Sequence, residues 1–361
     1  MPLSPRKRVE IALRGGSGPE VPFTAYDNHI PRCGTERVLR NMGMCSVVRM
    51  PVFKIRRPDV RVRQEVFFEG EKKLVRTHYS TPEGNLTTLD EPAPHTTWHL
   101  EKMFKSPEDY KAIRFLLSNE RYEPDYEPFA IARERFGEDG IFRAGLGSEP
   151  MQALISGNIF STEDFCLEWM DNRDEVLSLY EINVRNRREI YPIVARSPAM
   201  HANYGGNVVP EIVGADNFRD YYIPHYNEAA GIMHEHGKLI GSHFDANCGK
   251  LSGMIGASML DYIEAFTPSP DSDMTLKEAR LAWKGKAIWL NFPSSVHLGS
   301  EEKVENTAFE LLEEAGSPEG LIMGITEDVP EDRWQGNFLA IMRGLQKHAR
   351  MKPELYREQN S

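Results

Sequence analysis

The chain has 361 residues, of which 40% are hydrophobic and 27% are charged, and its formal net charge is −11. The negative charge argues against nonspecific nucleic-acid binding, which depends on Lys and Arg neutralising phosphates, and no apolar run approaches the roughly 20 residues that span a bilayer. Four scattered cysteines without a CxxC pair indicate neither a disulfide framework nor a thiolate metal cluster. The basic start is followed by no continuous apolar segment, so no secretory signal is expected and a cytoplasmic location is predicted.

The first predicted elements are an amphipathic helix over residues 5–14 and a buried strand over residues 21–26. The strand ends in a polar stretch, residues 26–29, whose side chains either line a pocket or cap a loop. From about residue 46 to residue 91 the pattern changes to strands joined by turns. We predict a small antiparallel β insertion there, placed after the first strand, which covers one end of the fold or contacts a partner.

From Ser106, which has the sequence of a helix N-cap, strands and helices alternate. The predicted strands are 141–146, 200–204, 238–242, 260–265, 287–292 and 321–326. With the strand at 21–26 they number seven, one short of a closed barrel of eight. We therefore predict an α/β fold, a (β/α)8 TIM barrel that forms a single domain over residues 1–361, with a doubly wound open sheet as the alternative. Neither of the usual glycine-rich nucleotide-binding motifs is present.

A histidine and two glutamates follow one another at strand-end positions or on the adjoining helix. Glu228 lies on a predicted helix, 14 residues separate it from His243, and another 20 residues separate His243 from Glu264. Ligands bind at the C-terminal strand ends of parallel α/β folds because these ends and their loops form the open rim. The three side chains are thus a plausible zinc set with one open coordination position. A hydrogen-bonded structural histidine and solvated glutamates are the alternative.

Several segments together resemble the uroporphyrinogen decarboxylase superfamily over nearly the whole chain. They are residues 4–13 leading into 21–23, the turn His-Phe-Asp-Ala-Asn-Cys-Gly at 243–249, residues 261–268 and residues 324–330. The resemblance implies a (β/α)8 barrel. It also implies one of two kinds of activity, since the superfamily contains decarboxylases and zinc-dependent methyltransferases that work with corrinoid proteins.

Two departures from the family patterns favour the methyltransferases. The decarboxylases share an arginine-bearing Met-Arg-Gln-Ala-Gly-Arg segment that binds porphyrinogen carboxylates, whereas Arg32 is the one fixed positive charge in the equivalent residues 25–34. The coenzyme M methyltransferases share a His-x-Cys and a later Cys, where this chain has His243-x-Asp245 and Glu327. Oxygen ligands in place of thiolates leave a more Lewis-acidic zinc, suited to an ether oxygen.

The spacing of Glu228, His243 and Glu264 also resembles the zinc motif of the methyltransferases of anaerobic O-demethylase systems. This resemblance implies transfer of a methyl group from a methoxylated aromatic compound to Co(I) of a corrinoid protein, with Zn2+ polarising the ether oxygen. The implied zinc ligands are Glu228, His243 and Glu264. Asp245 would orient His243 or protonate the leaving oxygen. Glu327 and Asp328 are reserve ligands or caps of the next helix.

The aromatic ring would contact side chains at the predicted strand ends. These are Tyr26, Tyr204, Phe266 and Asn291. The partners expected are a corrinoid protein and a small methoxylated aromatic substrate, without nucleic acid or membrane, and a homodimer is compatible with this interpretation. A uroporphyrinogen decarboxylase-like decarboxylase, a methylcobamide:thiol methyltransferase and a noncatalytic binding barrel are the alternatives.

Overall fold

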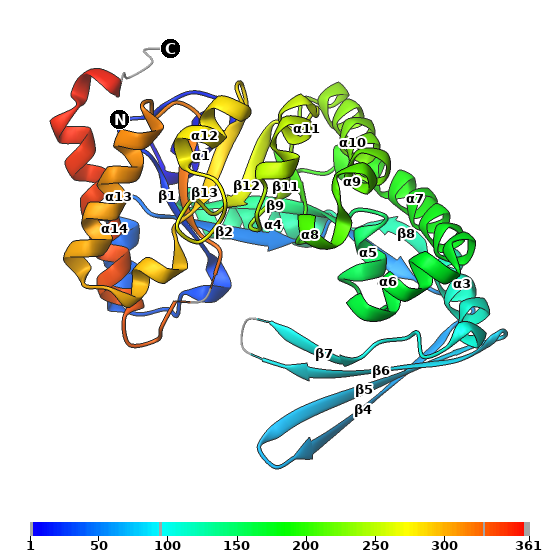
Figure 1. Ribbon diagram of the computed structural model, residues 1–361. Coiled ribbons are helices and arrows are strands. Elements are labelled where there is room, and N and C mark those ends of the chain that lie inside the picture. The colour runs from blue at the N-terminus through cyan, green and yellow to red at the C-terminus, as the bar shows by residue number, and fades with distance from the viewer. Residues whose placement is uncertain (1–2, 94–95, 328, 357–361) are drawn as a thin grey trace.

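The computed structural model describes residues 3–93, 96–327 and 329–356. A closed barrel of eight parallel strands forms its centre, in the order β1-β14-β13-β12-β11-β10-β9-β2 (Figure 1). The strands are β1 (Phe23–Tyr26), β2 (Cys45–Met50), β9 (Gly140–Gly147), β10 (His201–Tyr204), β11 (Leu239–His243), β12 (Tyr262–Phe266), β13 (Ala287–Asn291) and β14 (Leu321–Ile325). The predicted TIM barrel is therefore confirmed.

The strand that the sequence prediction lacked is β2. It pairs in parallel with β1, where Thr24 lies opposite Cys45, and with β9, where Ser46 lies opposite Gly140. The sequence pattern places residue 46 onward in the insertion, because β2 runs almost directly into β3 (Phe53–Arg56) and the strands that follow. The insertion thus follows the second barrel strand and not the first.

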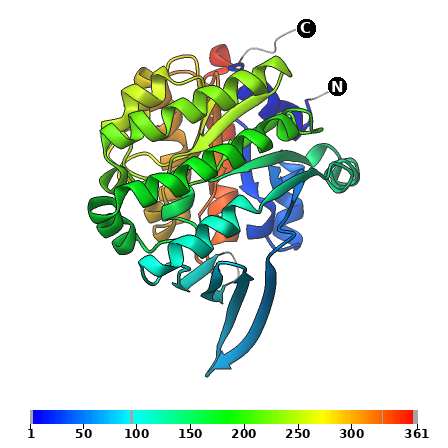
Figure 2. The same ribbon diagram turned by 90° about the vertical axis from the view of Figure 1, so that its right-hand side faces the viewer.

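Helices cover the outside of the barrel (Figures 1 and 2). They are α1 (Pro5–Leu13), α2 (Gly34–Asn41), α3 (Tyr110–Ser118), α4 (Glu127–Phe136), α5 (Gln152–Ile155), α6 (Thr162–Asp171), α7 (Arg173–Ala195), α8 (Pro210–Val213), α9 (Ala215–Tyr221), α10 (Ile223–Glu235), α11 (Ser252–Ala257), α12 (Leu276–Ala282), α13 (Glu301–Ala315) and α14 (Trp334–Met351). Local sequence explains their ends. Ser300 caps α13 by accepting a hydrogen bond from the Lys303 amide, and Gly316, at φ +70°, ends it. Within the described ranges, no helix has the length and apolar character needed to cross a membrane.

The predicted antiparallel sheet is present and projects from the barrel. Its strands are β4 (Arg61–Glu69), β5 (Lys72–Thr81), β6 (Gly84–Pro92) and β7 (Thr97–Glu101), in that order across the sheet. A separate strand pair joins β3 (Phe53–Arg56) to β8 (Arg121–Pro124). Figure 2 shows the hairpin of β4 and β5 extending away from the barrel. The chain after β7 returns to the barrel at the loop after α5, where the Met103 amide donates to the Asn158 carbonyl at 2.7 Å.

Alternation along the strands decides which side chains enter the barrel. Tyr262 and Trp289 belong to an interior cluster, which α1 helps to close, whereas Ile263 belongs to the larger core between strands and helices. On β12 the alternation breaks after Glu264, because Ala265 has φ +60° and the pairing with β13 shifts register there. Phe266 consequently packs in the outer core.

Candidate metal centre

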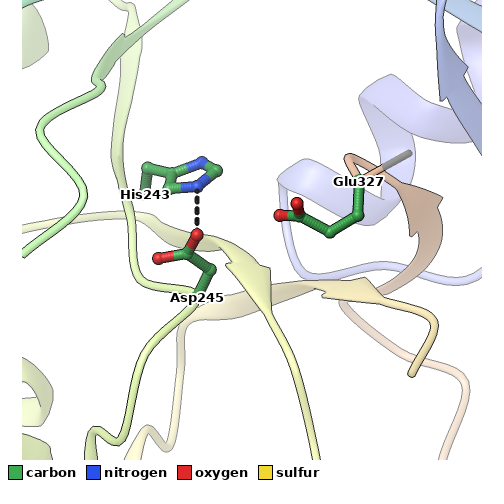
Figure 3. Close-up of side chains that lie close together, drawn as sticks. All are labelled: His243, Asp245 and Glu327. Atoms are coloured by element: carbon green, nitrogen blue, oxygen red, sulfur yellow. Dashed lines mark ion pairs between the residues drawn. The ribbon is translucent and has the colours of Figure 1, made fainter. Parts of the chain in front are cut away.

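Three side chains with metal-ligating atoms meet at the C-terminal ends of the barrel strands. His243 ends β11, Asp245 follows it closely, and Glu327 follows β14. One ligand atom from each lies within 4.8 Å of the other two, and all three residues are partly buried. Figure 3 shows the Glu327 carboxylate pointing toward the His243 and Asp245 pair. The Nε2 atom of His243 is 3.2 Å from Oδ2 of Asp245.

Glu264 orients His243 from inside the barrel. The two residues lie opposite each other in the pairing of β11 with β12, and the Glu264 side chain is fully buried. Its Oε2 atom is 2.6 Å from Nδ1 of His243. A carboxylate at Nδ1 holds the proton on that nitrogen and leaves Nε2 for the cluster, as is common for metal-binding histidines.

Glu264 is itself held by side chains from three other strands. Nη1 of Arg143, on β9, lies 2.8 Å from its Oε1 atom, and the Tyr26 hydroxyl, on β1, donates to the same oxygen. Nδ2 of Asn203, on β10, is 3.3 Å from Oε2. Burial alone would raise the pKa of Glu264, but Arg143 and His243 hold that pKa far below its usual range. Glu264 is therefore a permanently charged anchor beneath the cluster.

The contacts around Glu264 also affect the charges of His243 and Asp245. Burial opposes protonation of His243, but the carboxylates of Glu264 and Asp245 outweigh it and raise the pKa of His243 to about 10. Burial would raise the pKa of Asp245, yet its contact with His243 lowers that pKa below the usual value. Without a metal the pair is an imidazolium beside a carboxylate, and a cation that binds Nε2 displaces a proton.

The structure does not bring Glu228 to this cluster. Glu228 lies on α10 in the outer helical layer, with its Oε1 atom 2.7 Å from Nε of Arg188 and its Oε2 atom 3.2 Å from Nη2. Glu264 contacts Nδ1 of His243 and lies beside the cluster as its support. The geometry thus favours His243, Asp245 and Glu327 as ligands over the predicted set. Asp328, the other reserve ligand, lies outside the described residues.

Of the residues predicted to contact an aromatic ring, Tyr26 lies at the site. The other three lie in different surroundings. The Tyr204 hydroxyl hydrogen-bonds to the Tyr191 hydroxyl on α7, in the outer core. Phe266 packs edge-on against Trp283, with ring centroids 5.1 Å apart. Asn291 hydrogen-bonds to residues that follow β12 and β14, and so ties strand ends together.

A cavity of about 240 Å3 lies at the ends of β9 and β10. Arg49, Arg143, Ser148 and Asn203 supply its polar wall, and three glycines also line it. Arg143 and Asn203 also contact Glu264, so the cavity adjoins the support of His243. None of these residues was among the site residues predicted from the sequence. One feature of the sequence could have indicated Arg143: it is a charged residue within the mostly apolar run predicted as the strand 141–146.

The fold and the cluster together define a (β/α)8 barrel with a candidate metal centre at its open end. No protein-family model matches the chain, and no curated protein matches it. Solved structures are similar in fold. A methyltransferase from Methanosarcina mazei has 11% sequence identity and a TM-score of 0.58, over 96% of this chain and 99% of that chain.

Two further solved structures resemble the chain less closely. The spore cortex-lytic enzyme SleL of Bacillus megaterium has 11% identity and a TM-score of 0.35, over 63% of this chain and 64% of that one. A chitinase from Chromobacterium violaceum has 9% identity and a TM-score of 0.38, over 90% of this chain and 99% of that one. Of these three, the Methanosarcina mazei methyltransferase has a TM-score above 0.5, and at 11% identity this similarity supports the fold alone.

Proposed function

We propose that the protein is a zinc-dependent methyltransferase that moves a methyl group from a methoxylated aromatic compound to Co(I) of a corrinoid protein. The convergence of His243, Asp245 and Glu327 at the barrel opening is the observation that carries this proposal. The proposed activity is of the same class as that named for the Methanosarcina mazei protein of similar fold, which is called a methyltransferase.

The three side chains fit a catalytic zinc ion. One imidazole nitrogen and two carboxylate oxygens within 4.8 Å of one another match the three protein ligands of such sites, which keep a fourth position open. A zinc ion held there would supply a Lewis acid for the ether oxygen of the substrate. Glu264 would keep Nε2 of His243 available by accepting a hydrogen bond from Nδ1.

The proposed reaction exchanges one bond to the methyl carbon for another. The bond from the methyl carbon to the ether oxygen breaks, its electron pair stays on the oxygen, and Co(I) supplies the electron pair of the new carbon–cobalt bond. The products are a phenolate and a methylated corrinoid. Asp245, whose pKa is lowered beside His243, suits a ligand role better than that of proton donor. The phenolate would take its proton from water at the open end.

Two alternatives find less support. The Arg32 guanidinium, the sole fixed charge in the segment equivalent to the decarboxylase arginines, lies 2.8 Å from Asp27 and 2.7 Å from Glu36. It is therefore not free for a substrate with many carboxylates. A thiol methyltransferase site would favour thiolate ligands, and the cluster contains none among the described residues.

A direct test uses cob(I)alamin as methyl acceptor and a methoxyarene as donor, with methylcobalamin followed by its visible spectrum. The wild-type protein should transfer the methyl group, and His243→Ala should abolish transfer. Glu228→Gln is the matched control, because Glu228 pairs with Arg188 outside the cluster, and it should keep the wild-type rate. Undiminished transfer by His243→Ala, or no transfer by zinc-loaded wild type from any methoxyarene, would overturn the proposal.

A further inference from the structure

Arg49 presents a guanidinium without an ion-pair partner among the described residues to the cavity at the ends of β9 and β10. Its guanidinium carbon lies 3.9 Å from the centroid of the Tyr26 ring, so the planar group rests on the aromatic face. One nitrogen, Nη2, is 3.4 Å from Oδ1 of Asn28. In the described ranges no carboxylate lies within ion-pairing distance of Arg49. Stacking fixes the plane of the group while its other N–H donors remain available.

Two other arginines near the opening are neutralised, whereas Arg187, whose Nε donates to the Ser148 carbonyl at 2.8 Å, has no ion pair among the described residues. Arg143 pairs with Glu264, and Arg32 pairs with Asp27 and Glu36. Arg49, which lines the cavity itself, therefore carries an uncompensated positive charge there, in a chain whose net charge is −11. A cation without a partner that lines a cavity is a common feature of sites for anionic ligands.

The cavity wall also carries a polar atom without a partner. Oδ1 of Asn203 is buried and has no hydrogen-bond partner among the described residues. Buried polar groups in native proteins are nearly always hydrogen-bonded. Because this oxygen is an acceptor, its missing partner would be a hydroxyl group of the ligand or a water, and not the carboxylate itself. Nη1 of Arg143 is already engaged, 2.8 Å from Oε1 of Glu264.

We propose that this cavity binds the carboxylate of a small single-ring acid, with Arg49 as the anion-binding residue. A guanidinium and a carboxylate match each other as planar groups that form two parallel hydrogen bonds. The volume of about 240 Å3 lies just below the range of roughly 300–1,000 Å3 that is typical for larger ligands, which favours one ring. If the proposed function holds, on which this step rests, the methyl donor is a methoxylated aromatic acid.

Calorimetry with benzoate tests the binding site without any methyl transfer. Benzoate should bind wild type more tightly than its neutral analogue benzyl alcohol does. Arg49→Met should lower this preference by about 10-fold to 100-fold, the effect of losing charge-assisted hydrogen bonds. Arg49→Lys keeps the charge but not the planar guanidinium. Its preference for benzoate should lie between that of wild type and that of Arg49→Met. The control is Arg14→Met, at the end of α1, since Arg14 is also exposed and has no described acidic partner.

Several outcomes would overturn this inference. Equal benzoate affinity in wild type and Arg49→Met, or no preference for benzoate over benzyl alcohol in wild type, would exclude Arg49 as the anion-binding residue. Tighter Arg49-dependent binding of inorganic phosphate than of benzoate would exclude a carboxylate site. Circular dichroism and thermal melting of both Arg49 variants would separate loss of binding from loss of folding.

Methyl-transfer assays separate this inference from the proposed function. With cob(I)alamin as acceptor, Arg49→Met should raise KM for 4-methoxybenzoate about 10-fold more than it raises KM for methoxybenzene. Arg49-dependent benzoate binding without transfer from either donor would support the acid-binding site and contradict the methyltransferase. Transfer from both donors with no change in their KM ratio would support the methyltransferase and contradict the acid-binding site.

Discussion

Replacing Glu264 by Gln should destabilise the protein strongly, because the side chain is fully buried and its charge balances that of Arg143. The Arg143 guanidinium lies 2.8 Å from Glu264 and its side chain is only 7% exposed, so the variant would leave a buried cation without its partner. Removing one partner of a buried ion pair costs about 3–5 kcal/mol. The same variant would replace the carboxylate that accepts from Nδ1 of His243 by a neutral amide, and zinc affinity should fall about 10-fold to 100-fold.

The free energy of unfolding from urea titration measures this cost. Glu228→Gln is the matched control, because it makes the same chemical change in an ion pair with an Arg188 side chain that is 57% exposed, and it should cost about 0–1 kcal/mol. Adding Arg143→Met to Glu264→Gln should recover part of the loss, because the unpaired charge is then gone. A cost below about 1 kcal/mol for Glu264→Gln, equal to that of the control, would refute the assignment of Glu264 as a buried anchor.

Two further predictions concern the barrel interior. Burial lowers the pKa of His201 to about 3. As the pH drops below 6.5, the unfolded chain therefore binds a proton at His201 that the folded chain does not bind, and the free energy of unfolding falls. The loss attributable to His201 between pH 7 and pH 5 should be about 2 kcal/mol. His201→Gln should remove it, and an unchanged pH profile of unfolding would contradict this. Gly241→Ala should cost about 1–3 kcal/mol, since its Cβ would lie 2.2 Å from the Tyr262 ring. Gly253→Ala, exposed in α11 with no atom within 4 Å of the new Cβ, should not destabilise, and equal losses in the two variants would contradict the packing.

The barrel could be predicted because most of its strands are short apolar runs between helices. Residues 321–326, for example, cover β14 at Leu321–Ile325. β2 escaped prediction because its buried half, around Cys45 to Val47, continues into the exposed Arg49 and then into the β insertion. A strand that is buried at one end and polar at the other has the pattern of a sheet edge. The pairing with β1 and β9 that makes β2 a barrel strand is not encoded locally.

The site was predicted in part, since His243, Asp245 and Glu327 were all named from strand-end positions. The sequence could not show which acidic residue binds a metal and which one supports His243. Spacing along the chain does not show how deeply a side chain lies in the barrel. Glu264 lies inside, beneath His243, and takes the supporting role that the sequence suggested for Asp245. Nor does spacing give the side of a helix that faces a strand, which is why Glu228 was included.

The position of Phe266 has a local cause that the amino-acid sequence does not show. Regular alternation would place Tyr262, Glu264 and Phe266 on one face of β12. The positive φ of Ala265 turns Phe266 to the other side, away from the predicted substrate pocket. Arg49 and Arg143, which lie far apart in the sequence, come together in one cavity wall only through the order of the barrel strands.

Zinc content is the measurement that tests the central claim most directly, because it distinguishes the ligand set in the structure from the set predicted by spacing. Wild type and Glu228→Gln, purified and dialysed after exposure to zinc, should each hold about one ion per chain. His243→Ala and Glu327→Gln should lose it. Zinc that is absent from wild type, or that is retained by His243→Ala and lost from Glu228→Gln, would contradict the metal centre formed by His243, Asp245 and Glu327.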